Sequence, residues 1–381
     1  MDCNNSISKL RLMTILGTRP EVIKLSEIIK KADEYFEQRI VHTGQNYDYQ
    51  LNEIFFKDLG IRSPDVFLGV AGKDLGETLG NVLNKAYAAL SEYRPDAVLI
   101  LGDTNSALSA IPAKRLKIPI FHLEAGNRCF DENLPEEINR KIVDHISDVN
   151  LAYSEHARRY LLSEGIKPQQ TYVVGSPMNE VIKAHESEIN QSNVLESLGL
   201  IKQKYFLLSA HREENIDNEE NFFSLMKAIN NVAEIYDLPI VYSLHPRSAK
   251  YVKLRNFKFH PNVRALRPFG FFDYIKLQQN AKCVISDSGT LAEESSILKF
   301  PAVSIRTSTE RPEALDKGSF VIGGITTNEI CQSIEVAVGL AKEKLDPVPD
   351  YQDRNVSLKV IKIIQSYVGI VNRMTWRKKN Q

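Results

Sequence analysis

Charged and hydroxyl-bearing side chains follow the short apolar runs of this 381-residue sequence. They stand where successive runs end: Arg19, Asp103, Glu124, His211, His245, Ser288 and Arg311. Enzymes use carboxylates and histidine for proton transfer, and arginine for binding anions. One polar residue after a strand has no special meaning, since every strand ends in a loop. Seven in succession indicate a functional site, because functional residues gather on loops that a rigid scaffold holds.

Three carboxylates are candidates for general acid–base chemistry: Asp103, Glu124 and Glu136. Carboxylates that lie close together raise one another's pKa values, which suits proton transfer near neutral pH. Lys24 and Arg140 would offset part of their negative charge. The plainer interpretation of Glu136 is that it lies on the first turn of a helix, where a carboxylate complements the helix dipole.

Residues 286–290 read Ser-Asp-Ser-Gly-Thr and precede a predicted helix over residues 291–298. Small residues allow an anion to approach the backbone, and the free N–H groups at a helix start attract phosphate. The same pattern also forms an ordinary helix cap. Glu293 and Glu294 would complement the helix dipole, or one of their carboxylates would bind the two hydroxyls of a ribose.

Several other chemistries find no support in the sequence. The eight histidines show no spacing typical of metal ligands. Asp103 and Glu124 could hold magnesium for a nucleotide. We nevertheless expect neither a metal nor a cofactor. The P-loop signature is absent, and G-x-G-x-x-G does not follow the first apolar run, which disfavours an ATPase and a nicotinamide dehydrogenase. The four cysteines form neither a disulfide framework nor a zinc-spaced set.

The elements that must position these residues alternate short β-branched runs with helical ones, which predicts parallel α/β architecture. Predicted strands cover residues 12–16, 97–101, 118–123, 172–175, 205–209, 240–244, 283–285 and 302–305. A helix that begins at Pro20 would bury one apolar face, formed by Val22, Leu25, Ile29, Ala32 and Phe36. A polar stretch at 186–197 separates two series of strands, so we expect two domains, residues 1–185 and 186–359. Because ligands bind at the carboxyl ends of such strands, two facing domains would place the candidates on both walls of one cleft.

Composition limits the location and the partners. The 48 basic residues balance 48 acidic ones, so no net charge attracts nucleic acid or an anionic membrane. No apolar run approaches the ~20 residues of a membrane span, and the polar first residues do not resemble a secretory signal. We therefore expect a cytoplasmic protein.

Seven segments, in order along most of the chain, resemble the non-hydrolysing UDP-N-acetylglucosamine 2-epimerases. They are residues 17–21 (GTRPE), 102–104 (GDT), 122–126 (HLEAG), 135–140 (PEEINR), 209–213 (SAHRE), 286–289 (SDSG) and 309–313 (TERPE). The resemblance implies two Rossmann-like domains facing across a cleft, as in glycosyltransferases of the B type. A final helix is predicted over residues 355–371. The resemblance also implies that a C-terminal helix, placed at residues 360–381, joins the first domain, and that the protein is a homodimer.

The family pattern also implies roles for individual residues. It makes four residues catalytic: Asp103, Glu124, Glu136 and His211. It assigns the binding of a UDP-sugar to Arg19, Lys24, Arg140, Tyr274, Ser288, Gly289, Glu294 and Arg311, with Tyr274 where the family stacks an aromatic ring on uracil. The implied reaction eliminates UDP to give a glycal and then adds it back with inversion at C2.

The sequence departs from the family's usual E-A-G-L-R-T, since residues 124–131 read EAGNRCFD. With residues 41–48 (VHTGQNYD), this variant resembles the capsule and O-antigen branch, which converts UDP-2-acetamido-2,6-dideoxy-L-talose to UDP-N-acetyl-L-fucosamine. An apolar Phe130 would suit the C6 methyl group of such a sugar. The alternatives are a UDP-N-acetylglucosamine/UDP-N-acetylmannosamine 2-epimerase, a glycosyltransferase of the same fold, a hydrolysing epimerase and a non-catalytic UDP-sugar sensor.

Overall fold

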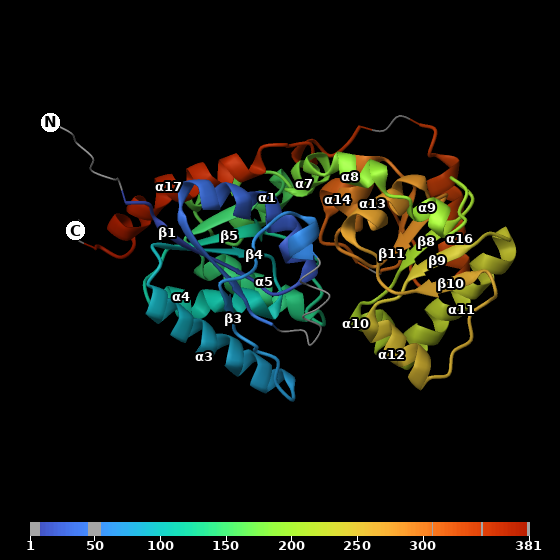
Figure 1. Cartoon of the computed structure of the whole chain (residues 1–381), viewed down its shortest axis with the longest axis horizontal. Helices are drawn as coiled ribbons and strands as arrows, with labels where there is room; N and C mark the ends of the chain where they lie inside the picture. The colour runs from blue at the N-terminus through green and yellow to red at the C-terminus, as the bar shows by residue number, and fades with distance from the viewer. Residues whose placement is uncertain (1–7, 45–54, 307, 344–345, 379–381) are drawn as a thin grey trace. The chain divides into compact units, whose positions relative to one another are not determined.

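The computed structural model describes residues 8–44, 55–306, 308–343 and 346–378. It consists of two compact α/β units (Figure 1). The N-terminal unit comprises Met1–Lys183 together with Asp353–Gln381, and the C-terminal unit comprises Ala184–Gln352. The chain thus leaves the first unit after residue 183 and returns at residue 353, whereas the sequence analysis placed these points at 185 and 360.

The N-terminal unit contains a parallel sheet of seven strands among the described residues, in the order β3-β2-β1-β4-β5-β6-β7. The strands are β1 (Arg11–Leu16), β2 (Glu37–His42), β3 (Val66–Phe67), β4 (Ala97–Leu101), β5 (Ile120–Ala125), β6 (Val149–Ala152) and β7 (Thr171–Val173). All five residues of β4 are buried. Such continuous apolar runs are typical of parallel strands that helices cover on both faces.

The main helices of this unit are α1 (Arg19–Tyr35), α3 (Leu75–Tyr93), α4 (Ala110–Arg115), α5 (Pro135–Ile146), α6 (Glu155–Ser163), α7 (Met178–Ala184) and α17 (Val356–Met374). The apolar face predicted for α1 is confirmed, because Val22, Leu25, Ile29, Ala32 and Phe36 are all buried. The C-terminal helix α17 packs beside α1 (Figure 1). It begins at residue 356, which confirms the helix predicted over residues 355–371 to within one residue at its start.

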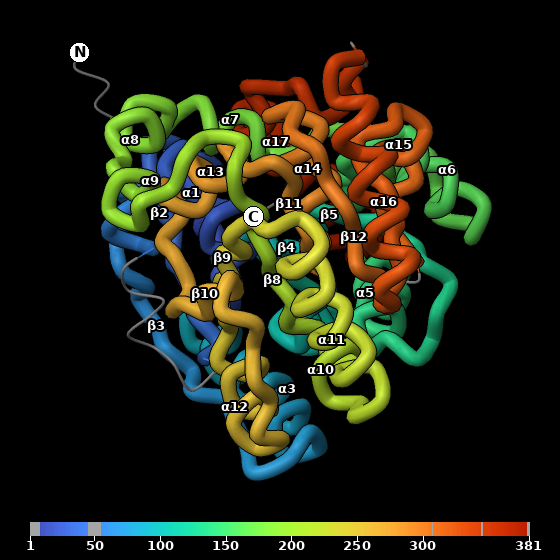
Figure 2. Tube along the Cα trace, turned by 90° about the vertical axis from the view of Figure 1, so that its right-hand side faces the viewer, coloured from blue at the N-terminus to red at the C-terminus, as the bar shows by residue number. Residues whose placement is uncertain are grey.

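The C-terminal unit contains a second parallel sheet, of six strands among the described residues, in the order β10-β9-β8-β11-β12-β13. The strands are β8 (Phe206–Ser209), β9 (Ile240–Ser243), β10 (Val263–Leu266), β11 (Cys283–Ser286), β12 (Ala302–Ser304) and β13 (Val321–Ile322). The helices are α8 (Glu186–Gln191), α9 (Val194–Ser197), α10 (Glu213–Ile216), α11 (Glu219–Tyr236), α12 (Pro246–Leu254), α13 (Phe271–Asn280), α14 (Leu291–Leu298), α15 (Pro312–Asp316) and α16 (Thr327–Gly339). Helices α11 and α16 lie side by side (Figure 2).

Each sheet has a point where the strand order reverses, between β1 and β4 in one unit and between β8 and β11 in the other. Loops that leave such neighbouring strands diverge to opposite faces and open a crevice at the carboxyl edge, where ligands bind in this class of fold. The candidate residues lie at these two edges. In the part of the chain that the structure describes, no helix has the length and apolar character that would let it cross a membrane.

Candidate active site

The turn between β1 and α1 is tied to the loop after β4 by the buried carboxyl group of Glu21. This side chain is 2% exposed and accepts hydrogen bonds from Gly17 N at 2.5 Å, Thr18 N at 2.8 Å and Thr104 Oγ1 at 2.6 Å. Burial raises the pKa of Glu21 to about 7, although each of these hydrogen bonds lowers it. Glu21 therefore fixes the backbone beside Asp103.

Glu124 adopts a strained backbone conformation within β5. The sequence placed it just after a strand that ends at 123, but β5 continues to Ala125 and its pairing with β6 shifts register at this point. The backbone of Glu124 has φ +69°, a left-handed value that costs a residue with a Cβ about 1 kcal/mol or more. The irregularity redirects the Glu124 side chain, as bulges beside active sites commonly do.

The Glu124 carboxylate forms an ion pair with Lys24. Lys24 Nζ lies 2.7 Å from Glu124 Oε2, and Lys24 is only 3% exposed. The ammonium group also lies 5.4 Å from the centre of the Tyr153 ring. Because both charges are largely removed from water, their attraction is stronger than that of a surface pair. This pair stabilises the strained conformation at Glu124.

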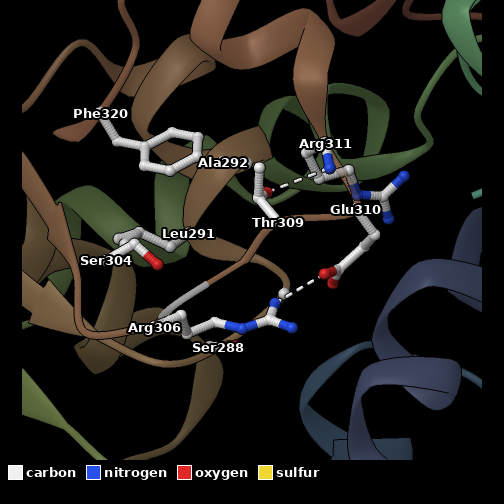
Figure 3. A pocket seen from close by; sticks show the side chains of 10 residues that line it. Ser288, Leu291, Ala292, Ser304, Arg306, Thr309, Glu310, Arg311 and Phe320 are labelled. Atoms are coloured by element: carbon white, nitrogen blue, oxygen red, sulfur yellow. Dashed lines mark hydrogen bonds and ion pairs between the residues drawn. The ribbon is translucent and has the colours of Figure 1, made fainter. Parts of the chain in front are cut away.

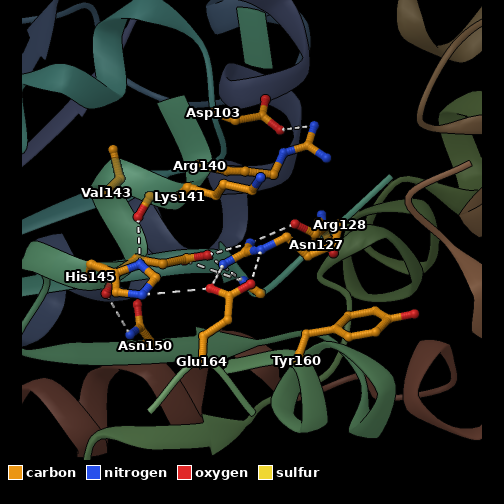
Figure 4. A network of polar contacts seen from close by, with 12 residues as sticks. Asp103, Asn127, Arg128, Arg140, Lys141, Val143, His145, Asn150, Tyr160 and Glu164 are labelled. Carbon is orange, nitrogen blue, oxygen red and sulfur yellow. Dashed lines mark hydrogen bonds and ion pairs between the residues drawn. The ribbon is translucent and has the colours of Figure 1, made fainter. Parts of the chain in front are cut away.

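Asp103 is held by Arg140, which projects from α5 (Figure 4). Arg140 Nη2 lies 2.6 Å from Asp103 Oδ2, and Arg140 Nη1 donates to Glu137 Oε2 at 3.0 Å. Asn139, from the same helix, donates to the backbone carbonyl of Asp103 at 3.0 Å. One turn of α5 therefore positions the Asp103 loop through both its backbone and its side chain.

The adjacent acids at the start of α5 have different environments. Glu137 is fully buried and accepts hydrogen bonds from the backbone N–H groups of Cys129 at 3.1 Å and Phe130 at 3.3 Å. Glu136 is partly exposed on the same turn. Glu137 thus holds the 129–130 backbone in place, while Glu136 keeps access to solvent. The sequence analysis selected Glu136 and overlooked the structural role of its neighbour.

A buried polar network lies behind these residues. His122 Nδ1 lies 2.9 Å from Asp144 Oδ1, and His122 Nε2 lies 2.8 Å from the Gly102 carbonyl. Arg128 donates to Asp144 at 2.7 Å and to both oxygens of Glu164, as Figure 4 shows. Burial opposes charge on both His122 and Asp144, but their mutual contact raises the pKa of His122 and, with Arg128, lowers that of Asp144. This charged network holds the loops that carry Asp103 and Glu124.

In the C-terminal unit, His211 is paired with Asp287 across the β8–β11 crevice. His211 Nδ1 lies 3.0 Å from Asp287 Oδ1, and the backbone N–H groups of His211 and Arg212 donate to Oδ2 at 2.8 and 2.9 Å. Burial raises the pKa of Asp287, but His211 and the two N–H groups outweigh it and lower the value to about 2. A charged carboxylate at Nδ1 orients the imidazole and leaves Nε2 for other contacts. His245 lies close, with a ring-centre distance of 5.4 Å.

The predicted anion-binding turn at 286–290 leads into α14, as expected, and contacts Glu294. Ser288 Oγ accepts from Thr290 N at 3.0 Å, and Thr290 Oγ1 donates to Glu294 Oε1 at 2.9 Å. Gln278 Nε2 donates to the other Glu294 oxygen at 2.6 Å. Each carboxylate oxygen can accept more than one hydrogen bond, so these contacts orient Glu294 and still allow it to accept from a ligand hydroxyl.

A pocket in this unit brings together three of the predicted nucleotide-binding residues (Figure 3). Its lining residues are Ser288, Gly289, Leu291, Ala292, Ser304, Arg306, Thr309, Glu310, Arg311 and Phe320. A Cβ atom at Gly289 would lie 2.8 Å from Glu310 Oε1, so a glycine allows close approach here. The pocket combines small residues, a helix start and arginines, which suits an anionic ligand.

The remaining candidates lie near these groups. Arg19 begins α1 beside the β1 turn, and its guanidinium lies 5.8 Å from the Phe55 ring centre. Tyr274 is half-buried in the C-terminal unit, and burial raises the pKa of its hydroxyl above the ordinary value. Residues 45–48, which carried part of the branch resemblance, lie outside the described residues.

The sequence analysis missed several functional contacts. Glu21, Asp287 and Arg306 each lie within or beside a recognised motif, yet only the fold shows which atoms they contact. The described part of the chain contains no cluster of three or more His, Cys, Asp or Glu side chains that could hold a metal ion.

Comparison with known proteins shows the family and the fold. The family model described as UDP-N-acetylglucosamine 2-epimerase matches residues 29–365. The structure of UDP-N-acetylglucosamine 2-epimerase from Rickettsia bellii is 45% identical to this chain with a TM-score of 0.91, and covers 97% of this chain and 100% of its own. The Methanocaldococcus jannaschii UDP-GlcNAc 2-epimerase, solved with UDP-GlcNAc and UDP, is 34% identical with a TM-score of 0.88, over 93% of this chain and 99% of its own.

A relative with another sugar in its name is also similar. The UDP-2,3-diacetamido-2,3-dideoxy-D-glucuronate 2-epimerase of Pseudomonas aeruginosa is 33% identical over 334 residues, which is 87% of this chain and 93% of that protein.

Proposed function

Because this chain belongs to the non-hydrolysing UDP-N-acetylglucosamine 2-epimerase family, whose members are isomerases, we propose that it inverts C2 of a UDP-2-acetamido sugar. The observation that carries the proposal is Glu124, a carboxylate held in a strained backbone conformation by a buried lysine. Strain of this kind persists where the surrounding structure enforces it, and it concentrates at active sites.

The chemistry explains why several acid–base groups are needed. No carbonyl lies next to C2 of a 2-acetamido sugar, so simple removal of the C2 proton is unfavourable. Instead, a base takes this proton while the C1–O bond breaks, and the bonding electrons of C1–O leave with UDP. The C2–H electrons form the C1–C2 double bond of a glycal. UDP then adds back to C1 as C2 receives a proton on the opposite face.

In this proposal the N-terminal unit supplies the proton-transfer carboxylates Asp103, Glu124 and Glu136. The C2 proton leaves from one face of the sugar ring and a proton returns on the other. An acid–base group is therefore needed on each side, which accounts for more than one carboxylate. Lys24 and Arg140 orient Glu124 and Asp103 through the ion pairs described above. Charge partners that are already in place avoid reorganisation during the reaction.

The C-terminal unit supplies UDP binding and His211. Ser288, Gly289 and Arg311 share one pocket, and Arg311 would stabilise the negative charge that develops on the departing diphosphate. Glu294 would accept from the ribose hydroxyls, and Tyr274 would contact uracil. Arg19, at the start of α1, would add a further cation for the diphosphate.

For the sugar, we propose UDP-2-acetamido-2,6-dideoxy-L-talose, converted to UDP-N-acetyl-L-fucosamine for a surface polysaccharide. Of the residues that depart from the family pattern, Asn127 contacts the candidate carboxylate Glu124, and Cys129 contacts the structural carboxylate Glu137. Asn127 Nδ2 lies 3.4 Å from Glu124 Oε1, and both Cys129 N and Cys129 Sγ donate to Glu137. Phe130 is 68% exposed, with its ring edge-on to Tyr160, and offers an apolar surface for a C6 methyl group.

Incubation of the protein in deuterated water with a panel of UDP-2-acetamido sugars, which includes UDP-N-acetylglucosamine and the 6-deoxy-L-sugar, tests this function. We expect C2 inversion of one donor, deuterium at C2 and no need for an acceptor. Turnover of UDP-N-acetylglucosamine alone, with the 6-deoxy-L-sugar unchanged, would reject the proposed sugar and favour the UDP-N-acetylmannosamine alternative. Transfer of the sugar to an acceptor without C2 exchange would indicate a glycosyltransferase, and accumulation of free UDP a hydrolysing enzyme.

A further inference from the structure

Arg306 is a buried cation in the wall of the pocket around Ser288. It follows β12 and is 4% exposed. Arg306 Nη1 donates to Glu310 Oε2 at 2.6 Å (Figure 3). Arg306 lies outside the seven segments that resemble the family, and it is not among the candidate residues of the sequence analysis.

The guanidinium of Arg306 is only partly satisfied. Its Nη2 group is buried and has no hydrogen-bond acceptor among the described residues. Its Nε lies 4.0 Å from Glu214 Oε1, beyond hydrogen-bonding distance. A buried charged donor without an acceptor destabilises the folded protein, so such groups usually have a role.

The carboxylate that hydrogen-bonds Arg306, that of Glu310, also faces a second arginine. Glu310 Oε1 lies 3.5 Å from Arg212 Nη2, while Arg212 Nε donates to the Asp287 carbonyl at 2.9 Å. Glu214 Oε1 lies 4.0 Å from both Arg212 Nη1 and Arg306 Nε, so two carboxylates face the two guanidinium groups, and the buried Nη2 group of Arg306 still has no acceptor among the described residues. Glu310 also lies against Gly289, because any side chain at position 289 would clash with the Glu310 carboxylate.

We propose that Arg306 binds the diphosphate of the nucleotide, with its unused N–H groups donating to a phosphate oxygen while Glu310 fixes the plane of the guanidinium. The inference rests on the proposed function, because it assumes that a nucleoside diphosphate occupies this pocket. Planar guanidinium groups match phosphate geometry, and a phosphate oxygen would accept hydrogen bonds from the buried donors of Arg306.

The test compares UDP with uridine, which has the same base and ribose but no phosphate. Calorimetry should show that Arg306→Gln raises the Kd of UDP about 10–100-fold, the range for hydrogen bonds to charged groups, and leaves the Kd of uridine unchanged. Arg306→Lys keeps the charge but not the planar fork, so we expect a smaller loss. If Arg306→Gln fails to fold, the Kd values of UDP and uridine are measured with Arg306→Lys instead. Arg264→Gln is the matched control, since Arg264 is exposed and donates to the Leu198 carbonyl.

Each outcome has a distinct meaning. Unchanged UDP affinity in both Arg306 variants would overturn the inference, while wild-type UDP binding and C2 inversion would leave the proposed function intact. Equal losses for UDP and uridine would assign Arg306 a structural role and also overturn it. If the wild-type protein binds no UDP, the proposed function itself falls.

Discussion

The two units arrange their charged groups differently at the carboxyl edges of similar sheets. In the N-terminal unit, Lys24 pairs with Glu124, and Arg140 pairs with Asp103 and Glu137. In the C-terminal unit, the pocket lining includes Arg306 and Arg311 but only one acidic side chain, that of Glu310.

This difference assigns proton transfer to the N-terminal unit and nucleotide binding to the pocket of the C-terminal unit. Carboxylates that already have cation partners are held in position before a ligand arrives, which suits groups that transfer protons to and from carbon. A pocket that combines two arginines with small residues and a helix start suits the binding of an anion. The account therefore predicts that substitutions in the N-terminal unit change turnover, whereas substitutions in the C-terminal pocket change nucleotide affinity.

The largest effect is expected for amide replacements of the proton-transfer groups. Asp103→Asn and Glu136→Gln should each lower kcat by roughly 10²–10⁴-fold, the usual range for general acid–base groups. KM should change much less, because these groups act mainly in the transition state. Glu132→Gln, an exposed neighbour on the same segment, is the control. Steady-state rates near wild type in variants that melt normally would show that the N-terminal carboxylates do not catalyse the reaction.

A second substitution sharpens the contrast between adjacent acids. Glu137→Gln should destabilise the protein by about 3–5 kcal/mol, because it removes one partner from a buried ion pair. Glu136→Gln should leave stability within about 0.5 kcal/mol, as surface substitutions usually do. Urea unfolding measures both. Equal stability of the two variants would contradict the structural role of Glu137.

The third prediction concerns Glu21 and pH. Its pKa rises from 4.5 in the unfolded chain to about 7 in the folded protein, so folding favours the protonated carboxyl. Its contribution is fully present below pH 4.5 and is lost as the pH rises through 7. Glu21→Gln resembles the protonated form, so this variant should gain up to about 3 kcal/mol over wild type between pH 5 and pH 8, at about 1.4 kcal/mol for each pKa unit. A pH-independent difference in urea unfolding would refute the raised pKa.

The smallest effects are expected at the candidate nucleotide-binding residues of the C-terminal unit. Arg311→Ala and Glu294→Ala should each weaken UDP binding by roughly 1.5–3 kcal/mol, the scale of a hydrogen bond to a charged group. Calorimetry measures the affinities, and thermal melting confirms that each variant is folded. Unchanged affinity in both variants would place the nucleotide elsewhere.

Much of the fold could be predicted because its strands are buried on both faces. The runs at 97–101 and 283–285 coincide with β4 and β11 to within one residue. Three of the four edge strands, β3, β10 and β13, were not predicted, whereas the edge strand β7 was predicted and the interior strands β2 and β6 were missed. β3 and β13 have two residues each, and β10 has exposed residues at its centre, so their apolar signal is weak.

The site could be predicted less completely, because spacing gives the residue type but not the environment. Nothing in the sequence distinguishes Glu136 from Glu137, although one is partly exposed and the other fully buried. The left-handed backbone at Glu124 was also unforeseen, since such a conformation normally favours glycine. The first feature depends on the 129–130 backbone, which folds over Glu137, and the second on the ion pair of Glu124 with Lys24.

The most direct test of the central claim is the rate of deuterium incorporation at C2 in Glu124→Gln, at saturating UDP-sugar in deuterated water. Gln can still accept a hydrogen bond from Lys24, so the local structure should survive. The account predicts that exchange slows at least about 100-fold, while UDP affinity stays within about threefold of wild type, since groups that act mainly in the transition state add little to ground-state binding. Exchange at the wild-type rate would contradict the assignment of proton transfer to the N-terminal unit.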